Sequence, residues 1–246
     1  MQAQNHPLAG LDYHGASQPA DGACGDFFGF LAIGERRLLA SIGEAPGSPL
    51  PALAVKAAID AHFRSGGAGE TDGLAAAASR LNRALCDSPV SGSILTLFCA
   101  CIDPLRRVVC YLSAGHEPAL LVRANRFRMH RLEPTGTVLG LTSRTVYRQR
   151  TLNLDPGDTL IAYTSGIADA QDRDGHAFGE AGVAEALREH RDEPPRLLVE
   201  RILAAARQYR DRAESPAGQT VLAVRFAGSA GSLHEDRAAD LAFAAA

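Results

Sequence analysis

The chain has 246 residues, of which 46% are hydrophobic, so it is long enough to bury a sizeable core in one large domain or two small ones. Its formal net charge is only −3, which argues against nucleic-acid binding through bulk electrostatics. The first ten residues lack the basic and apolar regions of a secretory signal, and no apolar run approaches the roughly 18 residues of a membrane span. We therefore expect a cytoplasmic protein without membrane contact.

The five cysteines are odd in number and form no CxxC pair, which disfavours both a disulfide framework and a zinc site. Cys99, Cys101 and Cys110 lie within apolar runs. We interpret these three as small buried hydrophobic residues in a reducing compartment.

The first half of the chain predicts short strands followed by two helices. Residues 1–10 predict a loose arm, and Gly34 with Glu35 between two apolar runs indicates a hairpin. Pro51 suits the first turn of a helix, and Asp72 can cap a second one. The predicted elements are strands at 11–15, 27–33 and 38–42, a helix at 51–64 with Val55, Ile59 and Phe63 on one face, and a helix after Asp72 with Leu74, Ala78, Leu81 and Leu85 as its apolar stripe.

The second half switches to strands and then returns to helices. The apolar run at 93–102 is typical of a strand covered on both faces. Arg144, Arg148 and Arg150 come nearest to a basic cluster, which a solvated strand edge explains at least as well as an anion site. The composition from Ala227 onward predicts a mostly disordered tail, in which 236–245 could form a short helix. Further strands are predicted at 108–113, 119–122, 127–132, 147–154, 159–164 and 220–226, and helices at 180–190 and 195–210.

This order of elements predicts an α+β fold. Many antiparallel strands with helices in two pairs suggest a layered sandwich, in which one helix pair covers the outer face of each sheet.

Seven motifs follow one another in a fixed order along the chain. Four lie in loops at predicted strand ends: CGDFFGF at 24–30, IGEAPGSP at 42–49, YTSGIADA at 163–170 and SPAGQTVLAV at 215–224. Between them come SAGHEPALL at 113–121, LEPTGTVLGL at 132–141 and LNLDPGDTLIAYT at 152–164. Together they resemble the bacterial SpoIIE/RsbU branch of the metal-dependent (PPM-type) serine/threonine phosphatases.

The resemblance covers residues 11–226 and implies the family's four-layer α-β-β-α sandwich, with two central antiparallel sheets flanked by helix pairs. Residues 1–10 are then an N-terminal arm and residues 227–246 a flexible tail. The resemblance also implies a centre of two Mn²⁺ or Mg²⁺ ions, held by an aspartate from each of the four loops. Such ions clamp phosphate oxygens and lower the pKa of the attacking water.

This chain keeps only the first of those four aspartates, as Asp26. The second loop has Glu44, whose carboxylate is one methylene further from the backbone, and the third has Ser165. The fourth has Ala217 and Gly218 where the family has two aspartates. Two divalent ions bring four positive charges and need oxygen ligands, mainly carboxylates. We therefore expect either no ion or one weakly held ion on Asp26 and Glu44, and no confident catalytic residue.

Other side chains near these loops leave alternatives open. Asp169 would share a helical face with Ser165, although a hydrogen bond at a helix end also explains it. Asp211 and Glu214 precede the fourth loop and could bend inward toward the site, although a solvated loop explains them better. His116 could suggest a general acid, but we expect it to form a hydrogen bond across a strand turn. The loop glycines Gly43, Gly47 and Gly166 are predicted where a positive φ or a close backbone approach is needed.

The leading hypothesis is a pseudophosphatase that acts as a protein-binding regulator in a partner-switching pathway of the anti-sigma type. The family implies a phosphoprotein or STAS-domain regulator as the partner, with no nucleic acid and no membrane. The alternative is an active or weakly active Mn/Mg-dependent phosphatase that removes phosphate from a STAS-domain partner, using Asp26, Glu44 and a rearranged third ligand. A third hypothesis is a dimer subunit whose former active-site face is the interface. The sequence leaves the oligomeric state open.

Overall fold

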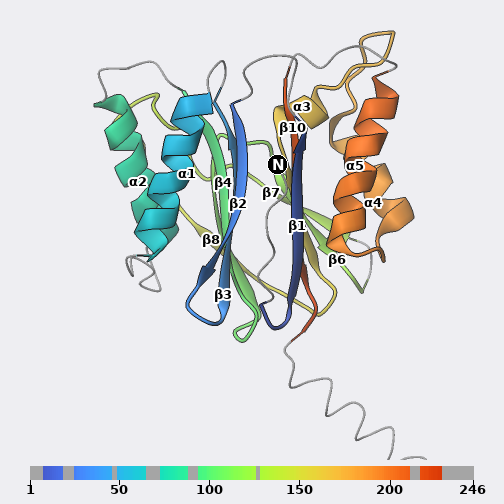
Figure 1. Ribbon diagram of the computed structural model, residues 1–246, viewed down its shortest axis with the longest axis horizontal. Coiled ribbons are helices and arrows are strands. Elements are labelled where there is room, and N and C mark those ends of the chain that lie inside the picture. Colours follow the sequence, from blue (N-terminus) through green and yellow to red (C-terminus); the bar gives the residue numbers. More distant parts are fainter. Residues whose placement is uncertain are drawn as a thin grey trace, which may run out of the picture.

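The computed structural model describes residues 8–18, 25–45, 49–64, 73–87, 94–125, 128–210 and 217–228. Two five-stranded antiparallel sheets lie face to face at the centre, and a pair of helices covers the outer face of each sheet (Figure 1). The expected four-layer α-β-β-α sandwich is therefore confirmed. No helix in these ranges combines the length and apolar character that crossing a bilayer requires.

The first sheet has the strand order β1-β10-β9-β6-β7. Helices α4 and α5 cover its outer face, and the short helix α3 follows directly after β9 (Figure 1). The bounds are β1 Leu11–Gln18, β10 Gln219–Phe226, β9 Thr159–Tyr163, β6 Ala119–Arg123, β7 Arg128–Leu132, α3 Ser165–Ala168, α4 Gly179–His190 and α5 Pro195–Tyr209.

The second sheet has the strand order β2-β3-β4-β5-β8, and helices α1 and α2 cover it. Gly34, with a φ of +61°, lies in the turn between β2 and β3, so the predicted hairpin is confirmed. The bounds are β2 Asp26–Ile33, β3 Arg37–Glu44, β4 Thr96–Asp103, β5 Val108–Ala114, β8 Arg150–Asn153, α1 Pro49–Arg64 and α2 Gly73–Cys86.

Three buried apolar layers hold the sandwich together: one between the sheets and one under each helix pair. Strand β3 shows why its sequence is almost unbroken in apolar residues. Leu38 and Ile42 belong to the layer between the sheets, whereas Leu39 packs under α1 with Val55 and Ile59. Because both faces of the strand are buried, charged residues appear only at its two ends, and the one polar residue within it, Ser41, is small and buried.

Three strand predictions were wrong in their bounds. The strand predicted at 11–15 continues to Gln18. The strand predicted at 147–154 is regular only over Arg150–Asn153, because the Tyr147 side chain is buried and donates a hydrogen bond to the Val138 carbonyl (3.2 Å) within an irregular loop. The strand predicted at 93–102 begins only at Thr96, and Leu95 forms an isolated bridge with Leu139. The helix considered at 236–245, Gly47 and Cys24 lie outside the described residues.

Candidate functional site

Asp26 and Glu44 are register partners in the hairpin of β2 and β3. Asp26 is the first residue of β2 and Glu44 the last of β3, so both carboxylates lie at the same end of the second sheet. Directly opposed residues of an antiparallel pair have Cβ atoms about 5 Å apart. The hairpin therefore brings together the two acidic side chains that the sequence singled out.

The third and fourth loops reach this pair from the first sheet. The Thr164 hydroxyl at the end of β9 donates to Oδ2 of Asp26 (2.9 Å), and the Thr220 hydroxyl of β10 donates to the same oxygen (2.8 Å). The Thr164 hydroxyl also lies 3.4 Å from the Gly218 carbonyl. Both threonines are fully buried, so Asp26 joins the two sheets at this end of the sandwich.

Ser165 contacts the other carboxylate. Its backbone N–H donates to Oε1 of Glu44 (3.2 Å) and its hydroxyl to Oε2 (2.7 Å). Burial raises the pKa of Glu44, the two Ser165 hydrogen bonds oppose that rise, and the nearby Asp26 and Glu117 add to it. Both oxygens of Glu44 are thus engaged by donors of the chain itself.

Close backbone packing explains the loop glycines, and positive φ does not. Gly43 and Gly166 both have φ outside the left-handed region. A Cβ on Gly166 would lie 2.0 Å from the Gly218 carbonyl oxygen, and a Cβ on Gly43 would lie 2.4 Å from the Thr96 carbonyl oxygen. The close-approach alternative is therefore the correct one for these two positions. The third and fourth loops pack against each other without room for a methyl group.

The donor set is short of free carboxylate oxygens for a pair of hard divalent ions. Of the five positions singled out from the sequence, only Asp26 and Glu44 carry a charge, and both accept hydrogen bonds from the third loop. Ser165 offers a neutral hydroxyl, and Ala217 and Gly218 offer only backbone oxygens. The residues present therefore fit a two-ion centre poorly, although one ion on the two carboxylates is chemically conceivable after those hydrogen bonds open.

Other acidic residues lie around the site without completing it. Asp169 follows α3 as its C-cap residue, where its N–H donates to the Ser165 carbonyl (2.7 Å) and its side chain is exposed. Burial raises the pKa of Glu117, and the charge of Asp169 raises it further. Sequence reasoning missed Glu117, since only its position next to His116 could have drawn attention to it. Asp211 and Glu214 lie outside the described residues.

Among the described residues, a different group of potential metal ligands has its ligand atoms within 4.8 Å of one another. It consists of Asp172, Asp174 and His176 and does not include Asp26 or Glu44. It lies on an exposed turn, in which Oδ1 of Asp172 accepts the backbone N–H groups of Asp174 and His176 (both 2.9 Å). This is the hydrogen bonding of a local turn.

His116 is a buried neutral side chain. Its Nδ1 lies 2.9 Å from the Thr96 hydroxyl and 3.8 Å from Oε1 of Glu44, and its carbonyl accepts the Ser113 hydroxyl (3.4 Å). These contacts across strands agree with the structural role expected for it. Burial lowers the pKa of His116 to about 3, so the imidazole is neutral at physiological pH and lacks the imidazolium form that acts as a general acid.

We predict that the His116 ring does not titrate between pH 8 and 5 in the folded chain. The unfolded chain takes up this proton near the usual pKa of 6.5, whereas the folded chain does so only near 3. Acidification through this window therefore lowers the free energy of unfolding. Histidine-selective NMR, assigned with His116→Gln, and urea unfolding at both ends of the window test this. A folded-state resonance that shifts near pH 6.5 would contradict it.

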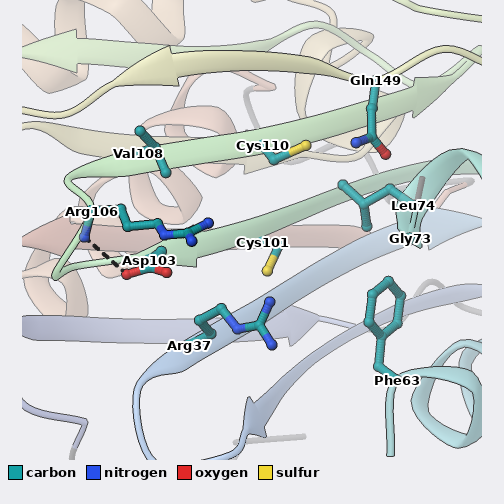
Figure 2. Close-up of a pocket in the computed structure, with 10 residues that line it drawn as sticks. All are labelled: Arg37, Phe63, Gly73, Leu74, Cys101, Asp103, Arg106, Val108, Cys110 and Gln149. Atoms are coloured by element: carbon teal, nitrogen blue, oxygen red, sulfur yellow. Dashed lines mark hydrogen bonds between the residues drawn. The ribbon is translucent and has the colours of Figure 1, made fainter. Parts of the chain in front are cut away.

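A cavity of about 90 Å³ lies at the opposite end of the second sheet and is separate from the site. Figure 2 shows Arg37 and Arg106 beside Cys101 and Cys110, which are register partners in β4 and β5. Burial raises the pKa of Cys101 to about 11, so its thiol stays protonated. Cys99, Cys101 and Cys110 are free. Cys99 is buried, as interpreted from the sequence, whereas Cys101 and Cys110 are only partly buried and pack against the apolar layer under α1 and α2.

Comparisons with known proteins agree with this geometry. Residues 34–226 match the family model described as Stage II sporulation protein E (SpoIIE). The phosphoserine phosphatase RsbU of Bacillus subtilis (strain 168) is 26% identical over 169 residues, which are 67% of this chain and 49% of RsbU. Protein IcfG of Synechocystis sp. is 35% identical over 92 residues, which are 37% of this chain and 14% of IcfG. The chain thus spans about half or less of these curated relatives.

Among solved structures, the SiaA-PP2C domain of Pseudomonas aeruginosa is similar with a TM-score of 0.74 and 21% identity, over 87% of this chain and 85% of that one. This likeness concerns the fold. The match of the family model over most of the sequence, on a four-layer sandwich with four converging loops, shows that the chain belongs to the SpoIIE family of RsbU-like PPM-type phosphatase domains.

Proposed function

We propose that this chain is a pseudophosphatase, a phosphatase-fold domain that works as a protein-binding regulator in a cytoplasmic partner-switching pathway of the anti-sigma type. The observation that carries the proposal is the state of the two remaining carboxylates. Asp26 accepts the hydroxyls of Thr164 and Thr220, and Glu44 accepts the N–H and hydroxyl of Ser165. One of these donors, Ser165, stands where the family has a metal ligand, and the other two flank such positions.

The charge balance of the site supports the loss of phosphatase activity. A pair of divalent ions carries four positive charges, and two carboxylates neutralise half of that. Ion binding would also break the hydrogen bonds of Ser165 to Glu44 and leave those donors facing a cation. Each buried group left unsatisfied costs about 1–3 kcal/mol. We therefore propose that two-ion catalysis is lost and that a single ion binds weakly or not at all.

The partner that we propose is a phosphorylated STAS-domain protein or a related switch protein. Support comes from the family and from the relative RsbU, which is named as a phosphoserine phosphatase. Within the described residues both five-stranded sheets and their helix pairs are complete from β1 to β10, so a binding surface can be kept while chemistry is lost. We propose the domain bounds 11 and 226 and leave residues 1–10 and 227–246 outside this unit, although Leu8 packs in the layer between the sheets and the Ala227 N–H donates to the Gly10 carbonyl (2.9 Å).

One observation favours the alternative, a weakly active Mn/Mg-dependent phosphatase. Asp26 and Glu44 are adjacent, and Glu117 is near enough to raise the pKa of Glu44. Three acidic groups around one point could recruit an ion if the third loop moved. In that case phosphate would leave the partner slowly, and the rate would depend on Mn²⁺.

The test measures binding and turnover on the same samples. Each STAS-domain protein of the host is purified in phosphorylated and unphosphorylated forms and titrated against the chain, and phosphate release is followed with excess Mn²⁺. We expect saturable binding of one such protein, no phosphate release, and no heat of Mn²⁺ binding in calorimetry.

Asp26→Asn is the matched control, because it removes the ligand charge while keeping a hydrogen-bond acceptor for Thr164 and Thr220. Mn²⁺-dependent phosphate release that Asp26→Asn abolishes would refute the pseudophosphatase proposal and establish the alternative. Failure of every STAS-domain protein to bind would refute the proposed partner class.

A further inference from the structure

A compact turn at residues 141–148, named here the basic turn, projects from the long irregular connection between β7 and β8. The Thr145 N–H and hydroxyl both donate to the Thr142 carbonyl (3.3 and 3.1 Å), which closes the turn. This closure places Leu141 and Val146 on its two sides and Arg144 near its tip. Long connections of this kind in compact domains are commonly functional.

A side chain of α2 and the buried Tyr147 ring hold the basic turn in place. Asn82 of α2 is 1% exposed, and its side chain donates to the Thr142 carbonyl (2.8 Å) and accepts the Gly140 N–H (2.9 Å). On the other side, the buried Tyr147 ring packs in the layer under α1 and α2. A turn fixed at both ends presents its outer side chains in a defined arrangement, which lowers the entropy cost of binding.

The outer side chains of the basic turn combine aliphatic groups with positive charge. Leu141 is 55% exposed and Val146 is 73% exposed, the highest value among the large hydrophobic residues of the described chain. Arg144 and Arg148 are also exposed. The sequence has no acidic residue between Glu133 and Asp155, while it has three arginines there.

Arg144 and Arg148 form no ion pair within the described ranges. Arginine ion pairs there involve other side chains, such as Arg123 with Asp158 and Arg131 with Glu180, and neither Arg144 nor Arg148 forms one. Exposed aliphatic groups next to unpaired cations are typical of a surface that contacts another protein. A solvated strand edge would account for the arginines but not for the exposed aliphatic groups.

The basic turn belongs to the same end of the sandwich as Glu44. Leu139, two residues before the turn, pairs with Leu95 through two backbone hydrogen bonds (2.8 and 3.1 Å). The next residue after Leu95, Thr96, is the register partner of Glu44. A protein bound at the former catalytic loops would therefore reach the basic turn.

We propose that the basic turn is a docking surface for an acidic protein segment that carries aliphatic side chains. The proposal rests on the proposed function and deepens it, because it names the chemistry by which the partner is recognised. Carboxylates of the segment pair with Arg144 and Arg148, and its aliphatic groups cover Leu141 and Val146. A nucleic acid fits less well, because Tyr147 is 4% exposed and offers no ring for base stacking.

The experiment uses the full chain and a fluorescein-labelled synthetic peptide in which pairs of glutamates are flanked by leucines. Fluorescence anisotropy at low salt should show saturable binding. Two double variants of the basic turn should each weaken peptide binding at least about tenfold. The first combines Arg144→Glu with Arg148→Glu, and the second combines Leu141→Ser with Val146→Ser. Added salt should weaken the charge-dependent part.

Matched controls come from the opposite end of the second sheet. Leu105→Ser changes a leucine of nearly equal exposure (54%), and Arg36→Glu reverses an exposed arginine in the β2–β3 turn. Both should leave peptide affinity unchanged. All these side chains are exposed, so circular dichroism should show native folding for every variant.

Four results would overturn the docking proposal: no peptide binding at low salt, equal losses in the control variants, equal binding of a peptide with serines in place of the leucines, or displacement of the peptide by oligodeoxythymidine. The outcome is separable from the proposed function. A STAS-domain protein that binds the turn variants as well as the unchanged chain would refute the docking surface alone, whereas Mn²⁺-dependent turnover with peptide binding intact would refute the pseudophosphatase alone.

Discussion

A variant carrying Glu44→Asp, Ser165→Asp and Ala217→Asp is expected to bind Mn²⁺ at least about 100-fold more tightly than the unchanged chain, because ligand charge and site rigidity tune cation affinity over several decades. With Asp26 the variant has four carboxylates for the four charges of two ions. It also removes the serine hydroxyl that occupies Oε2 of Glu44. Isothermal titration calorimetry measures the gain, and hydrolysis of an aryl phosphate shows whether turnover returns.

The structure gives a reason to expect that these three substitutions meet at one point. Thr164 touches Asp26 and the Gly218 carbonyl, and the next residue, Ser165, touches Glu44. The backbones of the four loops are therefore already assembled, and the missing component is anionic oxygen.

Two further variants make the restoration result specific. Asp26→Asn in the triple variant should remove most of the gained Mn²⁺ affinity. Ser165→Asp alone should lower the melting temperature in the presence of a chelator, because it places a second carboxylate where the serine hydroxyl lies 2.7 Å from Glu44. Excess Mn²⁺ should recover part of that loss. A triple variant that folds normally and gains no Mn²⁺ would show that these positions do not correspond to the family's ligands.

The layered fold could be predicted because periodicity and turn residues agree with the tertiary structure along most of the chain. The mostly apolar sequence of β3 follows from burial on both faces, and Gly34 marked its hairpin. Helix α3 escaped prediction because four residues are too few to show a helical period. Tyr147 misled the strand assignment, since an aromatic residue that anchors a loop looks the same in sequence as one in a strand.

The candidate site could be predicted only as a set of positions. Motif order gave Asp26, Glu44 and Ser165, but their hydrogen bonds depend on how the two sheets approach each other. Thr164 and Thr220 are 56 positions apart in sequence, and no local pattern indicates that their hydroxyls meet on one carboxylate oxygen. The finding that both remaining acids are satisfied internally therefore required the tertiary structure.

Gly43→Ala is expected to destabilise the chain by about 3 kcal/mol, at the upper end of the usual cost of overpacking. The added Cβ would lie 2.4 Å from the Thr96 carbonyl oxygen of the neighbouring strand and 2.7 Å from the Phe27 ring. Phe27 is the register partner of Gly43 and 2% exposed, so its ring has nowhere to move. Urea unfolding monitored by circular dichroism measures the loss.

Gly29→Ala is the matched control, since Gly29 lies on β2 in the same sheet and also has no positive φ. There the added Cβ would meet Cε of Lys56 at 2.4 Å, at the far end of a flexible side chain. Displacing Lys56 breaks only its partly exposed ion pair with Asp60, a contact worth about 0–1 kcal/mol, and replacing a strand glycine by alanine recovers a similar amount. Equal destabilisation by the two substitutions would contradict the argument from close approach. A large loss confined to Gly43→Ala would show that β3 and β4 approach each other beside Glu44 too closely to admit a methyl group.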